Sequence, residues 1–152
     1  MTTFLQQLKA LHSQRPERVA TYLQFSGRED VPITYDQILH GANTYASTLA
    51  SAGVKPGEVV VLILQHGEDL IYAFWGTILH GAIPSIMPFL TEKLSPERYR
   101  ADLTTLVSVT KPSAIITYPD FAAEIQTTLN GKDSTCSVIT TDQLEQKTDL
   151  HF

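Results

Sequence analysis

The chain has 152 residues, of which 43% are hydrophobic and 18% are charged, and 16 acidic against 11 basic side chains give a formal charge of −5. This length has room for one domain, and the composition is that of a globular chain, which excludes a disordered one. The acidic balance excludes the broad basic surface of a nucleic-acid-binding protein, and the most apolar window, residues 59–64, is too short to span a bilayer.

A single cysteine, Cys136, excludes an internal disulfide and fits a reducing compartment. The first residues carry Lys9 and Arg15 without a long apolar run, which argues against a signal peptide. We therefore expect a cytoplasmic protein.

Helix and strand signals alternate in the first third of the chain. Apolar residues at helical spacing predict a helix that ends before Pro16, and strands are expected at 19–25 and 31–33. Thr34 is a favourable N-cap for the next helix, and Gly53 is expected to end it in the left-handed conformation. The expected apolar face of this helix is Tyr35, Ile38, Leu39, Ala42, Ala46 and Leu49, opposite Gln37, Asn43, Thr44, Ser47 and Ser51.

The strongest strand signal is at residues 58–64, Glu-Val-Val-Val-Leu-Ile-Leu. Because it is apolar without alternation, we expect both of its faces to be buried, as in a parallel sheet covered by helices. The acids after Gly67 favour a helix start, and Gly81 is expected to close that helix. A strand follows at 82–87 and a loop at 89–94.

The second half repeats the same order. Ser95-Pro96-Glu97 combines an N-cap, a proline at the first helical position and an acid, and so predicts a helix start. Further on we expect a strand at 114–117, a helix at 121–129, a strand at 138–140 and a last helical turn capped by Thr141-Asp142. The alternation predicts one layered α/β domain over residues 1–152, with a mostly parallel sheet flanked by helices.

The residue types and their spacing alone do not indicate a catalytic site. The five histidines are not paired at metal-binding spacing, and His40 and His80 fall on polar helix surface, as solvated side chains. His66 follows the buried strand, at the sheet edge where open α/β folds bind ligands, but it lacks an acid or nucleophile partner, which favours a plain loop histidine.

Phosphate-binding signals are equally sparse. The eight glycines stand singly, so neither a dinucleotide fingerprint nor a phosphate loop can be drawn. Lys93, Arg98 and Arg100 could face a phosphate-bearing ligand, yet a solvated surface explains them better. Phe74 and Trp75 have the spacing of core residues.

Four stretches nevertheless follow one another in a familiar order. Residues 33–38, Ile-Thr-Tyr-Asp-Gln-Ile, are similar to Leu-Thr-Tyr-x-Glu-Leu, with Gln37 in place of Glu. Residues 53–60 resemble Gly-Val-x-x-Gly-Asp-x-Val, residues 73–84 resemble an Ala-Gly-Ala-x-x-Val-Pro helix end, and residues 111–117 fit a helix-to-strand step. In this order they resemble the opening motifs of adenylate-forming enzymes, the family of acyl-CoA synthetases and fatty acyl-AMP ligases.

The resemblance runs from about Arg15 to Leu144, which is only the front part of a full-length member. His80 stands where alanine is common, and the loop at 89–95 is longer than in many relatives, which leaves the subclass open. The resemblance implies a parent ligase that couples a carboxylic acid, in particular a fatty acid, to ATP with magnesium. The resulting acyl-AMP would pass its acyl group to coenzyme A or a carrier protein.

The resemblance also implies that the parent's working parts, a phosphate loop and a C-terminal domain with its lysine, come after Phe152. We therefore assign no catalytic, cofactor-binding or metal-binding residue within this chain, and expect it to be inactive alone. Its expected partners are the remainder of its own polypeptide and, through an exposed apolar face, a second copy of itself.

Two other hypotheses stay open at this point. One is a stand-alone interaction module that keeps the scaffold without the chemistry. The other is an unrelated small α/β binding domain that uses the sheet edge near His66. The acid, the acceptor and the extent of the gene beyond Phe152 do not follow from these residues.

Overall fold

The computed structural model describes residues 3–91, 93, 95–129 and 135–144. Helices and strands alternate along most of the chain, as the sequence predicts. In chain order they are α1 (Phe4–Gln14), β1 (Val19–Leu23), β2 (Val31–Thr34), α2 (Tyr35–Ser51), β3 (Val59–Ile63), α3 (Glu68–His80), β4 (Ile83–Ile86), α4 (Pro96–Thr110), β5 (Ala114–Thr117), α5 (Pro119–Leu129) and β6 (Ser137–Thr140).

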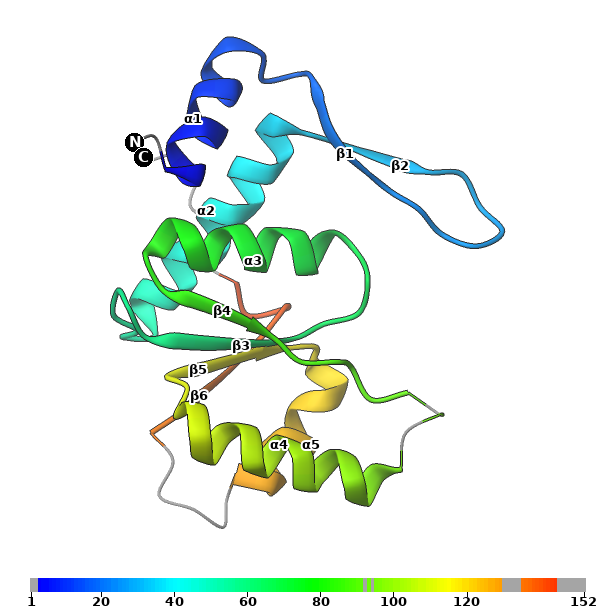
Figure 1. Ribbon diagram of the computed structural model, residues 1–152, viewed down its shortest axis with the longest axis vertical. Coiled ribbons are helices and arrows are strands. Elements are labelled where there is room, and N and C mark those ends of the chain that lie inside the picture. The colour runs from blue at the N-terminus through cyan, green and yellow to red at the C-terminus, as the bar shows by residue number, and fades with distance from the viewer. Residues whose placement is uncertain (1–2, 92, 94, 130–134, 145–152) are drawn as a thin grey trace.

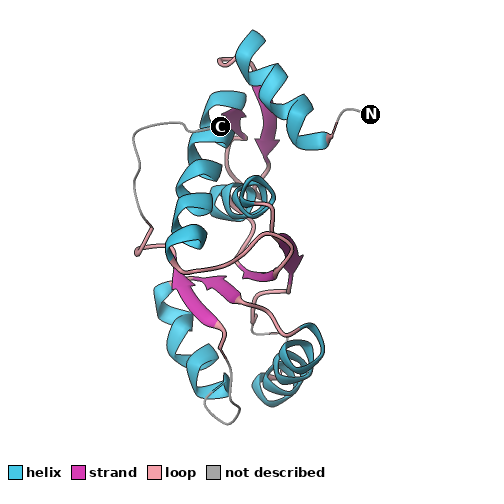
Figure 2. Ribbon diagram, turned by 90° about the vertical axis from the view of Figure 1, so that its left-hand side faces the viewer, coloured by secondary structure: helices cyan, strands magenta, loops and turns pink. Residues whose placement is uncertain are grey.

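Four parallel strands form the central sheet, in the order β4-β3-β5-β6. The pairs are in simple register: Val60 lies opposite Pro84 on one side and opposite Ala114 on the other. Helices α2 and α3 cover one face of this sheet, and α4 and α5 cover the other (Figures 1 and 2). The predicted fold class, a layered α/β domain with a parallel sheet, is confirmed.

The first two strands form a separate antiparallel hairpin, with an irregular register between Val19 and Thr21. The hairpin projects from the body beside the first helices (Figure 1). Leu23 and Ile33 hold the hairpin against the helices, because both are buried in a cluster that α1 and α2 complete with Leu8 and Leu39.

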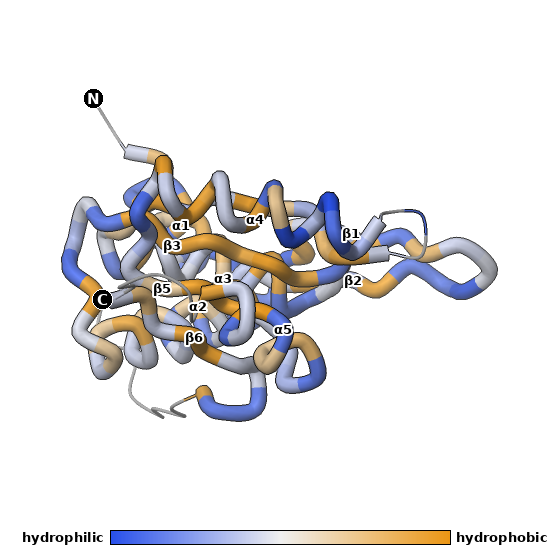
Figure 3. The backbone as a smooth tube through the Cα atoms, turned by 90° about the horizontal axis from the view of Figure 1, so that it is seen from below, coloured by the Kyte–Doolittle hydropathy of each residue, from blue (hydrophilic) through white to orange (hydrophobic). Residues whose placement is uncertain are grey.

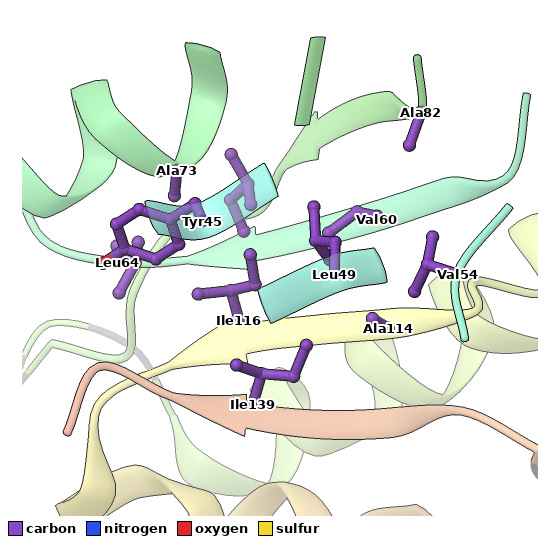
Figure 4. Close-up of a cluster of buried hydrophobic side chains, with 11 residues drawn as sticks. Tyr45, Leu49, Val54, Val60, Leu64, Ala73, Ala82, Ala114, Ile116 and Ile139 are labelled. Carbon is purple, nitrogen blue, oxygen red and sulfur yellow. The ribbon is translucent and has the colours of Figure 1, made fainter. Parts of the chain in front are cut away.

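The core has a layer on each face of the sheet. Alternate residues of β3 and β5 supply both layers: Val60 and Ile116 pack under α2 and α3, and Val61 and Ile115 pack against α4 and α5. Figure 4 shows the first layer, in which Leu49 of α2 meets the sheet. Figure 3 shows β3 as one continuous hydrophobic run, which explains why its sequence does not alternate.

Helix ends follow the predicted capping chemistry. The Thr34 hydroxyl oxygen accepts a hydrogen bond from the Gln37 backbone N–H, and the Gln37 side-chain oxygen accepts one from the Thr34 backbone N–H, so together they form a capping box. At the other end Gly53 has φ of 80°, and the Val54 amide donates to the Leu49 carbonyl. This is the Schellman geometry, with Val54 buried as expected.

Three local expectations were wrong. Asn43 is buried, because α3 packs along α2 and widens the buried face beyond the predicted stripe. Helix α5 begins at Pro119, two residues before the predicted start, as the first helical turn admits a proline. Thr141 and Asp142 form a turn in place of the expected helix, and the predicted helix stop at 130–131 lies outside the described residues.

Strand β4 is an edge of the sheet and carries Pro84. The backbone amides of Ile83 and Met87 donate to the carbonyls of Glu58 and Leu62 on the side of β3, so the backbone nitrogen of Pro84 points away from the sheet. A proline suits such a position, because it has no amide to leave unpaired. None of the helices in the described part of the chain has the length and apolar character needed to cross a membrane.

Candidate functional site

The loops that follow β3, β4 and β5 emerge at the same end of the sheet, beside the turn of the β1–β2 hairpin (Figure 1). In open α/β sheets, ligands bind outside the carboxyl ends of the parallel strands. Two pockets, each of about 360 Å³, open at this end of the molecule. We call them the hairpin pocket and the α4 pocket.

The hairpin pocket lies between the β1–β2 hairpin and the start of α3, and His66 is on its wall. His66 donates from Nε2 to the Gln24 carbonyl oxygen at 3.2 Å, and its ring meets the edge of Phe25 at 5.3 Å between centroids. The guanidinium of Arg28 covers the same Phe25 ring at 3.5 Å. These contacts tie the hairpin to the β3–α3 loop, which is a structural role for His66.

The hairpin pocket carries charges of both signs. Arg28 stands against Glu68 and Asp69 of the first turn of α3, where the helix dipole favours acids. Among the residues that the structure describes, no serine or cysteine nucleophile lines this pocket. The arrangement therefore provides a mixed polar surface without an acid–base or nucleophile–base pair.

A buried tyrosine lies directly behind the hairpin pocket. Tyr45 of α2 is 1% exposed and donates a 2.8 Å hydrogen bond to Oδ1 of Asp69. Burial, and after it the bond to Asp69, raises the pKa of the Tyr45 hydroxyl far above its ordinary value. The pair connects the middle of α2 to the first turn of α3 and so fixes one wall of the pocket.

Replacing Tyr45 with phenylalanine is expected to lower the free energy of unfolding by about 1 kcal/mol, because Asp69 loses its donor while the ring packing is kept. Since the pKa of Tyr45 is raised in the folded state, the folded protein binds this proton more tightly than the unfolded chain. Its stability must therefore fall as the pH rises above about 10. The loss should be smaller in Tyr45→Phe.

Urea unfolding at about pH 7 and about pH 10.5, followed by the fluorescence of the lone tryptophan, Trp75, measures both effects. Other tyrosines contribute to the alkaline loss, since burial also raises the pKa of the buried Tyr99 and of the half-buried Tyr72 and Tyr118. An equal alkaline loss in the variant and the parent chain would contradict the assignment to Tyr45.

The α4 pocket lies between the carboxyl end of β4 and one flank of α4. Its apolar wall is made by Ile86, Met87, Pro88 and Leu106. Tyr99 closes the floor: it is 4% exposed, its hydroxyl donates to the Pro88 carbonyl at 2.8 Å, and burial raises its pKa to about 12. At the mouth stand the exposed side chains of Arg98 and Asp102.

His12, His40 and His80 have structural contacts, and His151 lies outside the described residues. His12 donates to Asp36 at 3.0 Å and His40 lies 3.3 Å from the same carboxylate, so the three residues connect α1 to the start of α2. The expectation of a solvated side chain was wrong for His80, which is half-buried and donates to the Val54 carbonyl at 2.7 Å. No group of three or more potential ligands suited to a metal occurs among the described residues.

The basic residues of α4 and the loop before it do not converge. Lys93 is exposed, and Arg100 forms an ion pair with Glu124 of α5. Of these three residues, only Arg98 reaches one of the two pockets.

Of the aromatic pair Phe74 and Trp75, which the sequence predicted as core, Trp75 is half-buried. Its ring stacks on the exposed ring of Phe4 at 5.2 Å between centroids.

The lone cysteine is not a reactive nucleophile in this fold. Burial raises the pKa of the Cys136 thiol to about 11, which leaves it protonated and unreactive at neutral pH.

Sequence reasoning missed both the Tyr45–Asp69 pair and the α4 pocket. The acid in the first turn of α3 was visible as a helix-start signal, but its partner lies 24 residues earlier on another helix.

A family profile described as AMP-binding enzyme matches residues 8–151. Among curated proteins, the chain is 28% identical to 4-coumarate–CoA ligase 2 of Petroselinum crispum over 65% of this chain and 18% of that protein. It is 30% identical to L-2-aminoadipate reductase of Schizosaccharomyces pombe over 69% of this chain and 7% of that protein. The chain thus spans less than a fifth of these relatives.

Solved structures show the same fold. A fatty acid AMP ligase from Legionella pneumophila superposes with a TM-score of 0.77 at 21% identity, over 96% of this chain and 24% of that one. A benzoate CoA ligase from Burkholderia xenovorans superposes with a TM-score of 0.70 at 23% identity, over 94% of this chain and 26% of that one.

Proposed function

The chain belongs to the AMP-binding enzyme family, and from this premise we propose that it is the amino-terminal part of an ATP-dependent ligase that adenylates a carboxylic acid. The family match over residues 8–151 is the observation that carries the proposal. We propose a fatty acid as the substrate class. The structural likeness to a fatty acid AMP ligase supports the choice, together with the opening motifs of the sequence.

In the proposed parent, the acid's carboxylate attacks the α-phosphate of ATP, giving acyl-AMP and pyrophosphate. Magnesium bound by the parent would supply positive charge there, and together with basic groups it would neutralise the charge that develops on the phosphates. A thiol of coenzyme A or of a carrier protein then accepts the acyl group. In this proposal the residues that hold ATP and magnesium belong to segments other than residues 1–152, and this domain supplies a two-sided packed support for them.

Two features of the described residues support this division of labour. The pockets at the carboxyl end of the sheet contain no nucleophile paired with a base. The matched motif residues are instead caps and turns, such as Thr34 and Gly53, which build helices and the parallel sheet. We also propose a cytoplasmic location, on the grounds of the single cysteine and the cosubstrates required.

The isolated 152-residue chain is expected to fold and to catalyse no exchange of labelled pyrophosphate into ATP with any carboxylic acid. Exchange should appear in a longer polypeptide that joins these residues to a phosphate loop and a C-terminal domain. Circular dichroism of the isolated chain is the control that separates an inactive fold from an unfolded one. Robust exchange by the isolated, folded chain would overturn the proposed division.

When the remainder of the polypeptide is absent, we propose that the chain pairs with a second copy of itself. The edge strand β4 is the favoured contact, because Ile83 and Ile86 are 52% and 55% exposed there. Sedimentation equilibrium of the isolated chain tests this, and a monomer at all accessible concentrations contradicts it.

The second candidate is a non-catalytic interaction module on the same scaffold. Its support is that both faces of the sheet are already covered by this chain's own helices, so the domain has a complete core. The coding sequence after Phe152 distinguishes the two candidates. A stop codon there favours the module, and an open frame that continues into a phosphate loop favours the ligase.

A further inference from the structure

The α4 pocket adjoins the free edge of the sheet. Ile86 is the last residue of β4 and, with Met87 and Pro88 directly after it, lines the pocket. In the part of the chain that the structure describes, no strand pairs with the outer side of β4. A row of backbone groups and an apolar pocket therefore lie side by side.

We propose that this place binds a short extended segment of a partner polypeptide, which adds to β4 as an antiparallel strand and puts one apolar side chain into the α4 pocket. A basic side chain on the same face of the segment completes the match. The inference goes beyond the proposed ligase chemistry, since it involves neither ATP nor the acid.

The unpaired backbone groups of β4 are the first step of the argument. The amides of Ile83 and Met87 donate to carbonyls on the side of β3, and the N–H and C=O groups of a strand alternate in direction from residue to residue. The outward groups are therefore the Ile86 N–H and C=O and the Pro84 C=O. An extended polypeptide can pair with them, whereas a helix has already paired its own backbone groups internally.

Two prolines fix the register of the added strand. Pro84 and Pro88 have no N–H, and the Pro88 carbonyl already accepts a hydrogen bond from the Tyr99 hydroxyl. Within residues 84–88, Ile86 is then the outward position at which an added strand can exchange both hydrogen bonds. The added segment is short as a result, and the extended pairing that leads to aggregation is blocked.

The pocket selects the side chain next to the paired residue. Successive side chains of a strand point to opposite faces, so the residue opposite Met87 points to the α4 face, as Met87 itself does. The volume of about 360 Å³ has room for a leucine side chain between Met87, Pro88 and Leu106. Its transfer from water to this apolar wall favours binding.

The charges at the mouth of the pocket favour a basic neighbour. Arg98 is one cation against Asp102 and Glu97, and all three side chains are exposed. Asp102 lies 4.0 Å from Arg98, and their exposures of 67% and 83% make this attraction weak. Because α4 connects two parallel strands, it runs back along the sheet and carries Asp102 toward the level of Ser85. A lysine opposite Ser85 is therefore favoured over a glutamate.

The direct test uses the blocked peptide acetyl-Thr-Leu-Val-Lys-Thr-amide. Its valine is designed to pair with Ile86, and its leucine and lysine then point to the α4 face. Titration of the chain, labelled with ¹⁵N and with ¹³C in the methionine methyl groups, is expected to move the Met87 methyl and Ile86 amide signals together. The peptide should also slow hydrogen exchange at the Ile86 amide and leave Gly27, in the β1–β2 turn, unchanged.

Peptide variants separate the backbone from the side chains. An N-methyl group on the valine removes the N–H that bonds to the Ile86 carbonyl, and is expected to weaken binding about fivefold. The same group on the leucine, whose N–H points away from β4, is the matched control and should change little. Alanine in place of the leucine should weaken binding about tenfold, and glutamate in place of the lysine about threefold.

One pair of protein variants, each checked for its fold by circular dichroism, tests the charge. Asp102→Asn is expected to weaken binding of the lysine peptide about threefold. Glu29→Gln, at an exposed acid in the β1–β2 turn, changes the net charge equally and should leave the affinity unchanged. Equal losses in the two variants overturn the role of Asp102.

Three other results overturn the site. The first is a Met87 signal that moves while the Ile86 amide gains no protection, which shows adsorption without strand addition. The second is a dimer of the chain, paired through β4 as proposed above, that stays intact at saturating peptide. The third is an Ile86 amide already protected without peptide in a longer polypeptide, which shows that the chain's own remainder covers the edge. None of these outcomes depends on adenylation activity.

Discussion

Replacing Gly76 with alanine is expected to lower the free energy of unfolding by about 3 kcal/mol, although alanine is the better helix former. Gly76 lies where α3 crosses α2, and it is buried. A Cβ at this position would lie 2.5 Å from the Cβ of Tyr45 and 2.6 Å from the Ala42 carbonyl oxygen. Because the second contact is with backbone, the two helices must move apart to admit one methyl group.

Gly41 offers the matched comparison on α2. A methyl group there would meet the ring of Tyr72, a half-buried side chain that must rotate to make room, whereas the methyl group at position 76 also meets backbone. Gly41→Ala is therefore expected to cost less than Gly76→Ala, at about 1 kcal/mol. Urea unfolding followed by Trp75 fluorescence measures both variants. Equal costs, or a gain in stability at Gly76, would contradict the close helix crossing.

Truncating Ile115 or Ile116 to alanine is expected to lower the free energy of unfolding by about 3 kcal/mol in either case. The two residues are consecutive on β5 and point to opposite faces of the sheet, yet both are fully buried. Ile115 belongs to the layer under α4 and α5, and Ile116 to the layer under α2 and α3. In a sheet with one wet face, one of the two truncations would cost little.

Ile83→Ala on the edge strand β4 is the control, because the same atoms are removed from a side chain that is 52% exposed. Its expected cost is below about 1 kcal/mol. Equilibrium unfolding in urea, with the slope m compared between variants, separates a loss of stability from a change in the unfolded chain. A large difference between Ile115→Ala and Ile116→Ala would mean that one helix layer does not cover the sheet in solution.

The match between sequence and structure was close wherever the signal was local. Thr34, Gly53 and Ser95 mark helix ends because a cap is a contact among residues a few positions apart. The apolar run of β3 indicated a strand buried on both faces for a similar reason, since each side chain reports the polarity of its own surroundings. Asn43 was misplaced because its burial depends on α3, which is remote in sequence.

The candidate sites were less accessible from the sequence. His66 was found at the predicted sheet edge, but its bond to the Gln24 carbonyl joins residues 42 positions apart. The α4 pocket combines the end of one strand with one flank of a later helix, and neither segment carries a motif.

The sequence by itself determined the alternation of helices and strands, the two-sided burial of the sheet and the family to which the chain belongs. Those properties follow from short-range patterns of polarity and from residues with special backbone preferences. Only the tertiary structure decided which helix crosses which, that Asp69 accepts a hydrogen bond from Tyr45, and where the two pockets open. Such contacts join residues distant in the chain, and no local pattern encodes the geometry that brings them together.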